Sequence, residues 1–523
     1  MKRTTLSLIA VAGTLAAVTG VAALTAPDGA APANTSLPVR LPVERTALLC
    51  PGPSTSEVAE TAYTSYTPEG SAAGKTASGT SGTSGTAGAK AAGTGERTAA
   101  KAELKPAPVA PPPGEQPAKN TKGLKAPATV TKPGTPVGAE AKGADAPALT
   151  GSASGSLAPG WTVQQTTVVP AGGARGLLGV TCTAPDTDFW FPAASTAKQR
   201  QDYVHLTNPD DGTATADIEL YGPAGPLKLL STEGIPVPAH TTVPVLLSTL
   251  TSDPAQQDLT VHVTTRSGRV GAVVGAADDK AGADWLPASA DPSGTVVLPG
   301  IPADATSVRL VAYAPGDADA DLKIQLVTPT GKIVPASADA VHVKSGMTAA
   351  VDLPDLTRGE PGSLLLTPTD PKKATPVVAA LRVARGKGEQ QEIAFIPAAA
   401  PIEARATVAD NRAKGSTLAL TAPVGGAEVR ITASAGTQGG TPVSKTVTLK
   451  AGTTTSLAAP VPDGLKGSYA ITVERLSGGP VHASRLLELP QDGIPMFTVQ
   501  TFADDRGTVE VPTARQDLTV LDD

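Results

Sequence analysis

Aromatic residues are scarce in this chain, where they make up 3% of 523 residues. With so few rings, and with 54 Gly and 50 Pro, part of the chain cannot bury enough apolar surface to offset the entropy of ordering it. Proteins that bind nucleic acids neutralise the phosphates with clustered lysines and arginines. The formal net charge is −6, and the sequence contains no basic tract. We therefore expect no nucleic-acid partner.

Histidine and cysteine are also few, with five and two residues respectively. The histidines stand at positions 205, 240, 262, 342 and 482, and the sequence has no His-x-x-x-His or Cys-x-x-Cys spacing. Because zinc sites use such spacings, we expect no metal site and no cofactor. Residues 151–155 have the outline of a serine-hydrolase elbow, but Ala153 occupies the nucleophile position. We expect a non-enzymatic protein with no catalytic residues.

The first two dozen residues are similar to an export signal. Lys2 and Arg3 precede an uncharged run at residues 6–24, as in the apolar region of a signal peptide. Small residues near position 26 permit cleavage, and the run is also just long enough to span a bilayer. We expect residues 1–26 to be a signal peptide or a signal anchor. The protein is then extracellular or associated with the cell envelope, and it contacts the membrane only if residues 6–24 remain as an anchor.

A long segment at residues 67–158 consists mainly of Ala, Gly, Thr, Ser, Pro and Lys. Such a composition buries too little apolar surface to offset the entropy of ordering the chain. We expect this segment to be a disordered spacer. It separates an N-terminal strand segment at residues 36–53 from the body of the protein.

The two cysteines, Cys50 and Cys182, lie on either side of this spacer. In an oxidising compartment an isolated pair most simply forms one disulfide. Neither cysteine has a His, Lys or Arg as an immediate neighbour, which argues against a reactive thiol. We predict a Cys50–Cys182 disulfide that links the N-terminal strand to the body.

An internal repeat of about 106 residues organises the body. Corresponding prolines fall at positions 209, 315 and 423. We place the three repeats at residues 161–290, 291–390 and 391–490, and a C-terminal β tail at residues 491–523. Each repeat ends in two apolar runs around a turn, which we interpret as a hairpin.

Apolar and polar residues alternate within the repeats, for example at residues 321–326, with the period of a half-buried strand. Gly and Pro interrupt the chain frequently, and no window has the apolar stripe of a helix. We predict an all-β protein of tandem immunoglobulin-like β-sandwich repeats. The alternative is a β-propeller, closed by pairing of the C-terminal tail with the N-terminal strand that ends at Cys50.

Four short motifs are distinctive. They are Leu-Cys-Pro-Gly-Pro at residues 49–53, Cys-x-Ala-Pro at residues 182–185, Phe-Trp-Phe at residues 189–191 and Leu-Thr-Asn-Pro at residues 206–209. Together they resemble a secreted actinobacterial family of unknown function. The resemblance implies a cell-envelope protein, and it supplies no activity or site residues.

Aromatic residues gather in the first repeat, where Trp190, Tyr203 and Trp285 are candidate ligand contacts. Such rings more often anchor a core than stack on a sugar. We expect a non-enzymatic scaffold or interaction module of the envelope, whose partner is an envelope protein or a glycan. The alternatives are a carbohydrate-binding module and a cell-wall polysaccharide enzyme.

Overall fold

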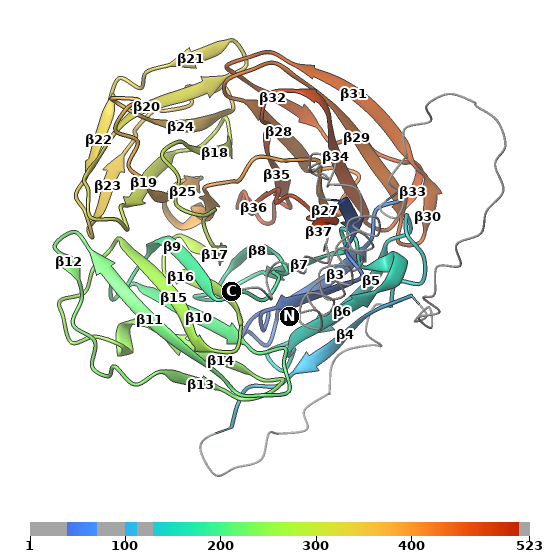
Figure 1. Ribbon diagram of the computed structural model, residues 1–523, viewed down its shortest axis with the longest axis horizontal. Coiled ribbons are helices and arrows are strands. Elements are labelled where there is room, and N and C mark those ends of the chain that lie inside the picture. Colours follow the sequence, from blue (N-terminus) through green and yellow to red (C-terminus); the bar gives the residue numbers. More distant parts are fainter. Residues whose placement is uncertain (1–38, 71–99, 112–128, 512–523) are drawn as a thin grey trace, which may run out of the picture. The chain divides into compact units, whose positions relative to one another are not determined.

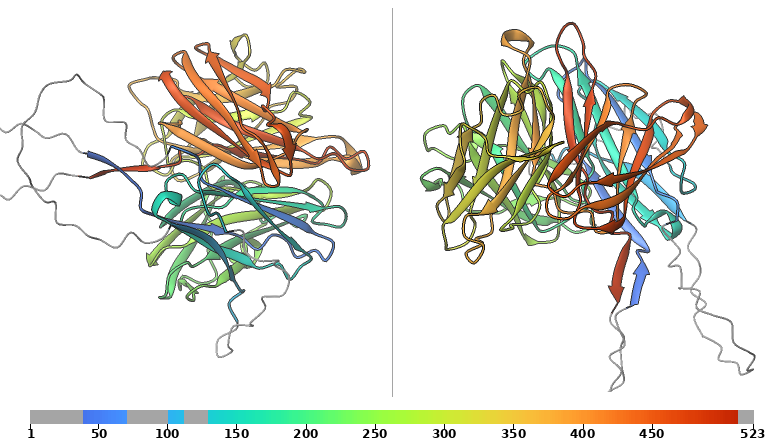
Figure 2. Two further views of the ribbon diagram at one scale, coloured as in Figure 1. Left: turned by 90° about the vertical axis from the view of Figure 1, so that its right-hand side faces the viewer. Right: turned by 90° about the horizontal axis from the view of Figure 1, so that it is seen from above.

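The computed structural model describes residues 39–70, 100–111 and 129–511, and these divide into two compact units. The expected signal segment at residues 1–26 lies outside the described residues, as does the end of the expected tail from residue 512 onward. In the smaller unit β1 (Val39–Pro42) pairs with β37 (Thr508–Val511), and the two strands run side by side in Figure 2. Arg40 and Glu510 form an exposed ion pair across them at 3.1 Å.

The larger unit, residues 42–508, consists almost entirely of antiparallel strands. Its described sheets pair into four β-sandwiches, each with an inner sheet, an outer sheet and its own apolar core (Figure 1). The prediction of an all-β protein of tandem sandwiches is confirmed. The described helices are three short 3₁₀ turns, η1 (Gly155–Leu157), η2 (Leu247–Thr249) and η3 (Gly388–Gln390).

The first sandwich precedes the region that the sequence repeat marks most clearly. Its outer sheet has the order β2-β6-β4 and its inner sheet the order β5-β3-β7-β8. Tyr63, Leu104, Leu149 and Trp161 are buried in its core. The strands are β2 (Arg45–Cys50), β3 (Glu60–Tyr66), β4 (Lys101–Ala107), β5 (Val137–Lys142), β6 (Ala148–Ser154), β7 (Thr162–Val169) and β8 (Gly176–Thr181).

The second sandwich has the inner order β14-β10-β16-β17 and the outer order β12-β11-β15-β9, with β13 also paired to β11. Phe191, Leu206, Leu220 and Val261 are among its buried core residues. The strands are β9 (Asp188–Ala194), β10 (Arg200–Thr207), β11 (Ala214–Gly222), β12 (Gly225–Pro226), β13 (Ile235–Val237), β14 (Thr242–Leu246), β15 (Leu259–Ser267), β16 (Gly271–Asp278) and β17 (Gly282–Leu286).

The third sandwich has the inner order β23-β19-β25-β26 and the outer order β18-β24-β20-β21, with β22 also paired to β20. In β20 the buried Leu322, Ile324 and Leu326 alternate with more exposed polar residues, as the sequence pattern predicts. The strands are β18 (Val296–Ile301), β19 (Ser307–Tyr313), β20 (Ala320–Thr328), β21 (Gly331–Ile333), β22 (Ala340–Val343), β23 (Thr348–Asp352), β24 (Gly362–Pro368), β25 (Val378–Arg385) and β26 (Glu392–Pro397).

The fourth sandwich has the inner order β32-β28-β35-β36 and the outer order β27-β34-β29-β30-β33, with β31 also paired to β29. Leu420, Val429, Ile471 and Phe502 lie in its core. The strands are β27 (Arg405–Asn411), β28 (Ser416–Ala422), β29 (Ala427–Gly436), β30 (Gly439–Thr441), β31 (Val443–Leu449), β32 (Thr453–Ala458), β33 (Asp463–Lys466), β34 (Tyr469–Gly478), β35 (His482–Glu488) and β36 (Phe497–Thr501).

Within residues 42–508 the four sandwiches pack against one another in a closed cycle (Figure 1). The last inner strands form a cycle of contacts in the order β8, β17, β26 and β36, and β36 contacts β8 again. The first outer strand of each sandwich also contacts the inner sheet of the next, as β2 contacts β16, β9 contacts β25, β18 contacts β35, and β27 contacts β7. Each sandwich is therefore held between two neighbours.

The prediction that residues 67–158 form a disordered spacer is wrong for the part that the structure describes. Strands β4, β5 and β6 lie within this range and complete the first sandwich. The glycine at position 151 of β6 fits this packing, because a Cβ there would lie 2.5 Å from the ring of Trp161. The proline-rich segment is also paired, since the Ala110 amide donates to the Thr242 carbonyl at 2.8 Å. Residues 71–99 and 112–128 lie outside the described residues.

Strand pairing differs from two further expectations. The runs expected to form hairpins enter opposite sheets, as β15 lies in an outer sheet and β16 in an inner one. The turns are real, but packing between two sheets chooses the partners of each strand. The strand that ends at Cys50 pairs with β6, whereas the tail strand β37 pairs with β1 and β36 pairs with β35. The tail therefore pairs with the N-terminal segment at residues 36–53, as the propeller alternative expects, but through β1 and not through the strand that ends at Cys50. The cycle itself closes by packing of sandwiches.

Repeat boundaries also shift relative to the sandwiches. Strands β7 and β8 lie within the predicted first repeat, residues 161–290, but belong to the first sandwich. Strand β36 lies within the predicted tail, residues 491–523, but completes the inner sheet of the fourth sandwich. A strand belongs to the sheet that buries its apolar face, which a sequence period alone does not specify.

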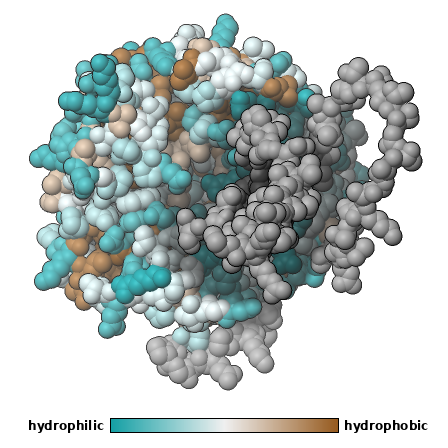
Figure 3. Space-filling model, viewed as in Figure 1, coloured by the Kyte–Doolittle hydropathy of each residue, from teal (hydrophilic) through white to brown (hydrophobic). Residues whose placement is uncertain are grey.

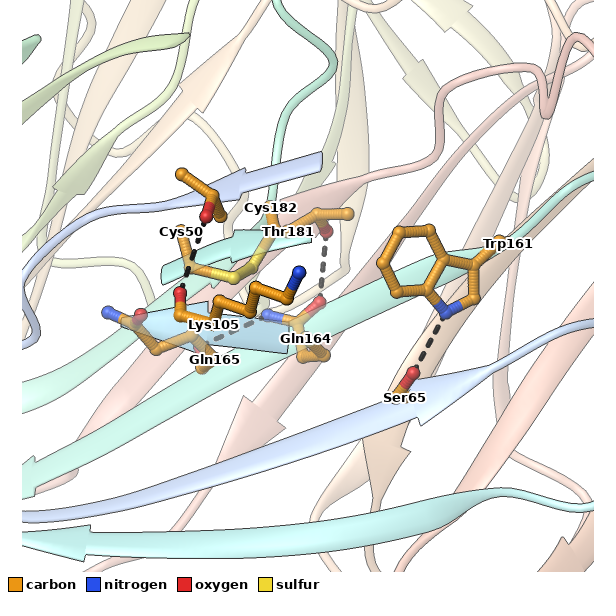
Figure 4. Close-up of a disulfide and its surroundings, with 9 residues drawn as sticks. Cys50, Ser65, Lys105, Trp161, Gln164, Gln165, Thr181 and Cys182 are labelled. Atoms are coloured by element: carbon orange, nitrogen blue, oxygen red, sulfur yellow. Dashed lines mark hydrogen bonds between the residues drawn. A yellow bond between two sulfur atoms is a disulfide. The ribbon is translucent and has the colours of Figure 1, made fainter. Parts of the chain in front are cut away.

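The predicted disulfide between Cys50 and Cys182 is present in the first sandwich (Figure 4). It connects the end of β2 in the outer sheet to the residue that follows β8 in the inner sheet. Nearby, the indole of Trp161 donates a hydrogen bond to the Ser65 hydroxyl at 2.9 Å (Figure 4). Among the described residues, no helix is long and apolar enough to cross a membrane.

Candidate functional site

The structure separates the three aromatic residues that the sequence suggested as ligand contacts. Trp190 on β9 lies at the border of the second and third sandwiches, where its ring stacks on His262 at 3.6 Å and on Tyr313 at 5.3 Å between centroids. Tyr221 lies beside both Trp190 and Tyr313. Because neighbouring rings already stack on Trp190, this residue acts first as a contact between two sandwiches.

Tyr203 and Trp285 lie on the inner sheet of the second sandwich, away from Trp190. Both contact His205, and the Trp285 ring meets it edge-on at 5.1 Å between centroids. Trp285 is 3% exposed and packs among apolar residues of the first and second sandwiches. Burial lowers the pKa of His205 to about 4. The three aromatic residues therefore do not form one ligand surface.

A buried polar network lies where the last inner strands meet. Asp284 on β17 accepts hydrogen bonds from the Gly179 amide at 3.0 Å and from the Thr498 hydroxyl at 2.9 Å. The side-chain amide of Gln500 donates in turn to the Thr498 hydroxyl at 2.6 Å. These contacts join the first, second and fourth sandwiches. Burial raises the pKa of Asp284 well above its ordinary value, although its hydrogen bonds act in the opposite direction.

Glu392 on β26 brings the third sandwich into contact with the first. Its carboxylate lies 3.6 Å from the guanidinium of Arg175, which also donates hydrogen bonds to the carbonyls of Glu389 and Gln391. Burial raises the pKa of Glu392 to about 8, and the charge of Arg175 offsets part of this rise. Perturbed carboxyl groups are typical of active sites and also of structural ion pairs. Neither Asp284 nor Glu392 lines the two cavities described below.

The junction between the fourth and first sandwiches, here called the closing junction, is unusually polar. Thr64 on β3 donates to the Asp410 carboxylate at 3.2 Å, and its hydroxyl also lies 3.0 Å from that of Ser468. Near this junction Arg485 is fully buried, and its Nη1 donates to the Asp410 carbonyl at 3.2 Å. The Nε and Nη2 atoms of Arg485 have no partner among the described residues. Burial lowers the pKa of Arg485 to about 10.

Two small cavities lie between consecutive sandwiches. One, of about 270 Å³, lies between the first and second sandwiches and is lined by Thr55, Ser56, Gln201 and Asp279, with small residues around them. The other, of about 230 Å³, lies between the third and fourth sandwiches. We call this second space the Arg385 cavity, after the residue at its charged end.

The Arg385 cavity is built from three structural elements. Its floor is the face of the fourth inner sheet, where Thr417 and Ala419 on β28, Ser456 on β32 and Ser484 on β35 lie side by side. The end of β18 and the loop after it, residues 300–304, form one wall. The last residue of β25, Arg385, lies at the charged end.

The ion pairs at the end of the cavity fix its charged side chain. Arg385 binds Asp304 through two hydrogen bonds of 2.8 and 2.7 Å, and it contacts Glu488 at 2.7 Å. The sequence hints at such sites through charged residues inside apolar strands, as at Asp284, Arg385 and Arg485, but it does not reveal their partners.

No group of three or more metal-ligating side chains occurs in the described part of the chain. The chain matches a family model described as a family of unknown function (DUF5719) over residues 137–460. No curated protein and no solved structure matches it. The matched range begins at β5, includes the whole of the second and third sandwiches, and ends after β32. The expectation that the chain resembles a family of unknown function is therefore confirmed. Because the match covers more than half of the 523 residues, the chain belongs to the family of unknown function DUF5719.

Proposed function

We propose that the protein is an exported, non-enzymatic scaffold of the cell envelope that holds several interaction surfaces at fixed relative positions. The observation that carries this proposal is the cyclic packing of the four sandwiches. A linear chain of domains bends at its linkers, whereas each sandwich in this cycle contacts two others. Loops at the ends of different sandwiches therefore keep their spacing, as an assembly platform requires.

Export is supported by the N-terminal apolar run and by the disulfide of the first sandwich. Disulfides persist in oxidising compartments and are rare in the cytosol. The distribution of apolar side chains on the surface suits partner contacts of modest area. On the face seen in Figure 3, apolar side chains form small separate groups among polar ones, as on many soluble proteins.

The scaffold role is tested by site-specific photo-crosslinking in the producing organism. Leu230, Val334 and Val424 are 65%, 58% and 74% exposed and belong to the second, third and fourth sandwiches, so each position tolerates a bulky crosslinker. We expect the same envelope protein or glycan to be captured from at least two of these positions. Turnover of an envelope polysaccharide by the purified full chain, abolished by one carboxylate substitution, would instead establish the enzyme alternative.

A further inference from the structure

The Arg385 cavity contains two buried polar groups that lack partners among the described residues. They are the Nη1 atom of Arg385 and the hydroxyl of Ser484. The residues are 7% and 1% exposed, and both line the cavity. A buried polar group without a partner has lost its hydrogen bonds to water without replacing them, so a ligand that pairs with these groups is favoured.

The surroundings hold these groups in place. Asp304 and Glu488 fix the guanidinium of Arg385, which also lies over the Phe497 ring at 5.0 Å from its centroid. The Ser484 hydroxyl lies against Gly300, where a Cβ would collide with it and where φ is +89°. Glycine at position 300 therefore leaves room for the Ser484 hydroxyl at the wall of the cavity.

Charge limits the ligands that fit. One guanidinium stands between two carboxylates, so the end of the cavity carries a net charge of about −1. A phosphate or carboxylate would meet Asp304 and Glu488 as well as Arg385, and repulsion from the two acids would oppose its binding. The cavity favours a neutral ligand.

Shape and lining restrict the ligand further. About 230 Å³ is less than the roughly 300 Å³ at which sites for drug-sized molecules begin, so the space suits a single ring. None of the residues that line it is aromatic, which removes stacking as a source of affinity for a flat ligand. The lining offers hydroxyl groups from Thr417, Ser456 and Ser484 that both donate and accept hydrogen bonds.

We propose that the Arg385 cavity binds one neutral sugar residue, such as the end of a glycan chain. One sugar hydroxyl accepts from Arg385 Nη1, and its neighbour exchanges hydrogen bonds with Ser484. A further hydroxyl donates to the carboxylate of Glu488. A pyranose places donors and acceptors on adjacent carbons, which matches this mixed lining. This assignment is independent of the scaffold role and of the three aromatic residues suggested by the sequence.

The first cavity extends the proposal to a second binding position. It is formed by similar parts of the first and second sandwiches. These are the loop after the first outer strand, the loop after the third inner strand β7, and residues in and just after the inner sheet of the next sandwich. It too combines hydroxyl groups with one carboxylate, that of Asp279.

The test uses the purified full chain and saturation-transfer NMR with methyl α-glucoside, methyl α-galactoside, methyl α-mannoside and N-acetylglucosamine, with glucuronate as the acidic comparator. We expect at least one neutral sugar to give saturable binding, and glucuronate to bind at least tenfold more weakly. Ser456→Leu fills the cavity from its half-buried floor and should weaken binding at least tenfold. Ser477→Leu introduces the same side chain at an exposed position of the same sandwich and should leave binding unchanged.

Thermal unfolding of both variants shows whether the fold survives, and Ser484→Ala provides a milder change at the same site. The proposal is overturned if none of the neutral sugars binds, if glucuronate binds as well as they do, or if folded Ser456→Leu and Ser484→Ala both bind like the unchanged protein. Failure here would leave the crosslinking test of the scaffold unaffected, because that test uses other positions.

Discussion

The hydroxyl groups of Thr64 and Ser468 lie 3.0 Å apart, one on each side of the closing junction. The fourth sandwich meets the first there through polar side chains and through two small apolar clusters, one of Tyr66, Ala409 and Ala470 and one of Leu177, Leu487 and Met496. The junction between the first and second sandwiches buries a larger apolar cluster that includes Val180, Val273 and Trp285. Apolar burial supplies most of the favourable free energy of packing, and at the closing junction it is divided between two clusters and interrupted by buried polar groups. We therefore expect the closing junction to be the weaker of the two.

We predict that the cycle opens first at the closing junction. Strands β3 and β27 meet at the closing junction, and β28 and β18 occupy the same positions at the junction between the third and fourth sandwiches. Backbone hydrogen exchange should be faster in β3 and β27 than in β28 and β18. A disulfide formed by Thr64→Cys with Ser468→Cys should slow this exchange and raise the melting temperature. The hydroxyls of Ser363 and Thr421, 2.7 Å apart, supply a matched cysteine pair between the third and fourth sandwiches. An equal or larger gain from that control pair would show that the closing junction is not the weak point.

Removal of the native disulfide should destabilise the first sandwich more than the others. Cys50 and Cys182 are separated by 132 positions, and closure of a loop of this size stabilises a fold by about 2–5 kcal/mol. We expect the double variant Cys50→Ala with Cys182→Ala to unfold its first sandwich at a lower urea concentration than the unchanged protein. Limited proteolysis at increasing urea concentrations should then detect early cleavage before residue 183. Dithiothreitol should reproduce the effect in the unchanged protein. Uniform loss of protection across all four sandwiches would contradict this prediction.

The free energy of unfolding should fall as pH rises, because Glu392 has a higher pKa in the folded chain than in the unfolded chain. The unfolded carboxyl loses its proton near its ordinary value of 4.5, while burial holds the folded pKa at about 8. Between these values the unfolded state binds fewer protons than the folded state, so deprotonation favours unfolding.

Replacing Glu392 by Gln isolates this contribution. The buried Asp284 and Asp202, whose pKa values are also raised, act in the same direction, and His205, whose pKa is lowered, acts in the opposite one. The difference between Glu392→Gln and the unchanged protein therefore reports Glu392 alone. Urea unfolding near pH 5 and near pH 8 should show a smaller loss of stability in the variant. An equal loss of stability in the variant and in the unchanged protein would mean that Glu392 is ionised in the folded protein at both pH values.

Trp190→Ala should lower stability without removing sugar binding. The ring is stacked between His262 and Tyr313, so its loss leaves a gap at the border of two sandwiches and should cost about 2–4 kcal/mol in the free energy of unfolding. Denaturant titration measures this cost, and Trp190→Phe should retain part of the stability. Loss of glycan binding by a folded Trp190→Ala protein would instead place a ligand at this residue.

The sequence by itself determined the strand class, the disulfide and the repeating unit. Alternation in runs such as β20 fixes which side chains face a core, and two isolated cysteines leave one simple pairing. It did not identify the first sandwich, because β4, β5 and β6 are rich in small residues whose composition is also that of a linker. Their apolar partners, such as Tyr63 and Trp161, are distant in the sequence.

Only the tertiary structure decided which strands pair, how the four sandwiches close into a cycle, and where polar groups meet. The turn between β15 and β16 is visible in the sequence, but the two strands enter different sheets because each buries its apolar face against a different neighbour. Arg385, Asp304, Glu488 and Ser484 come from two strands, β25 and β35, and from the loop after β18, and no local pattern brings them together. Charge partners and cavities arise from packing over long sequence distances, whereas strand character is set by the nearest few residues.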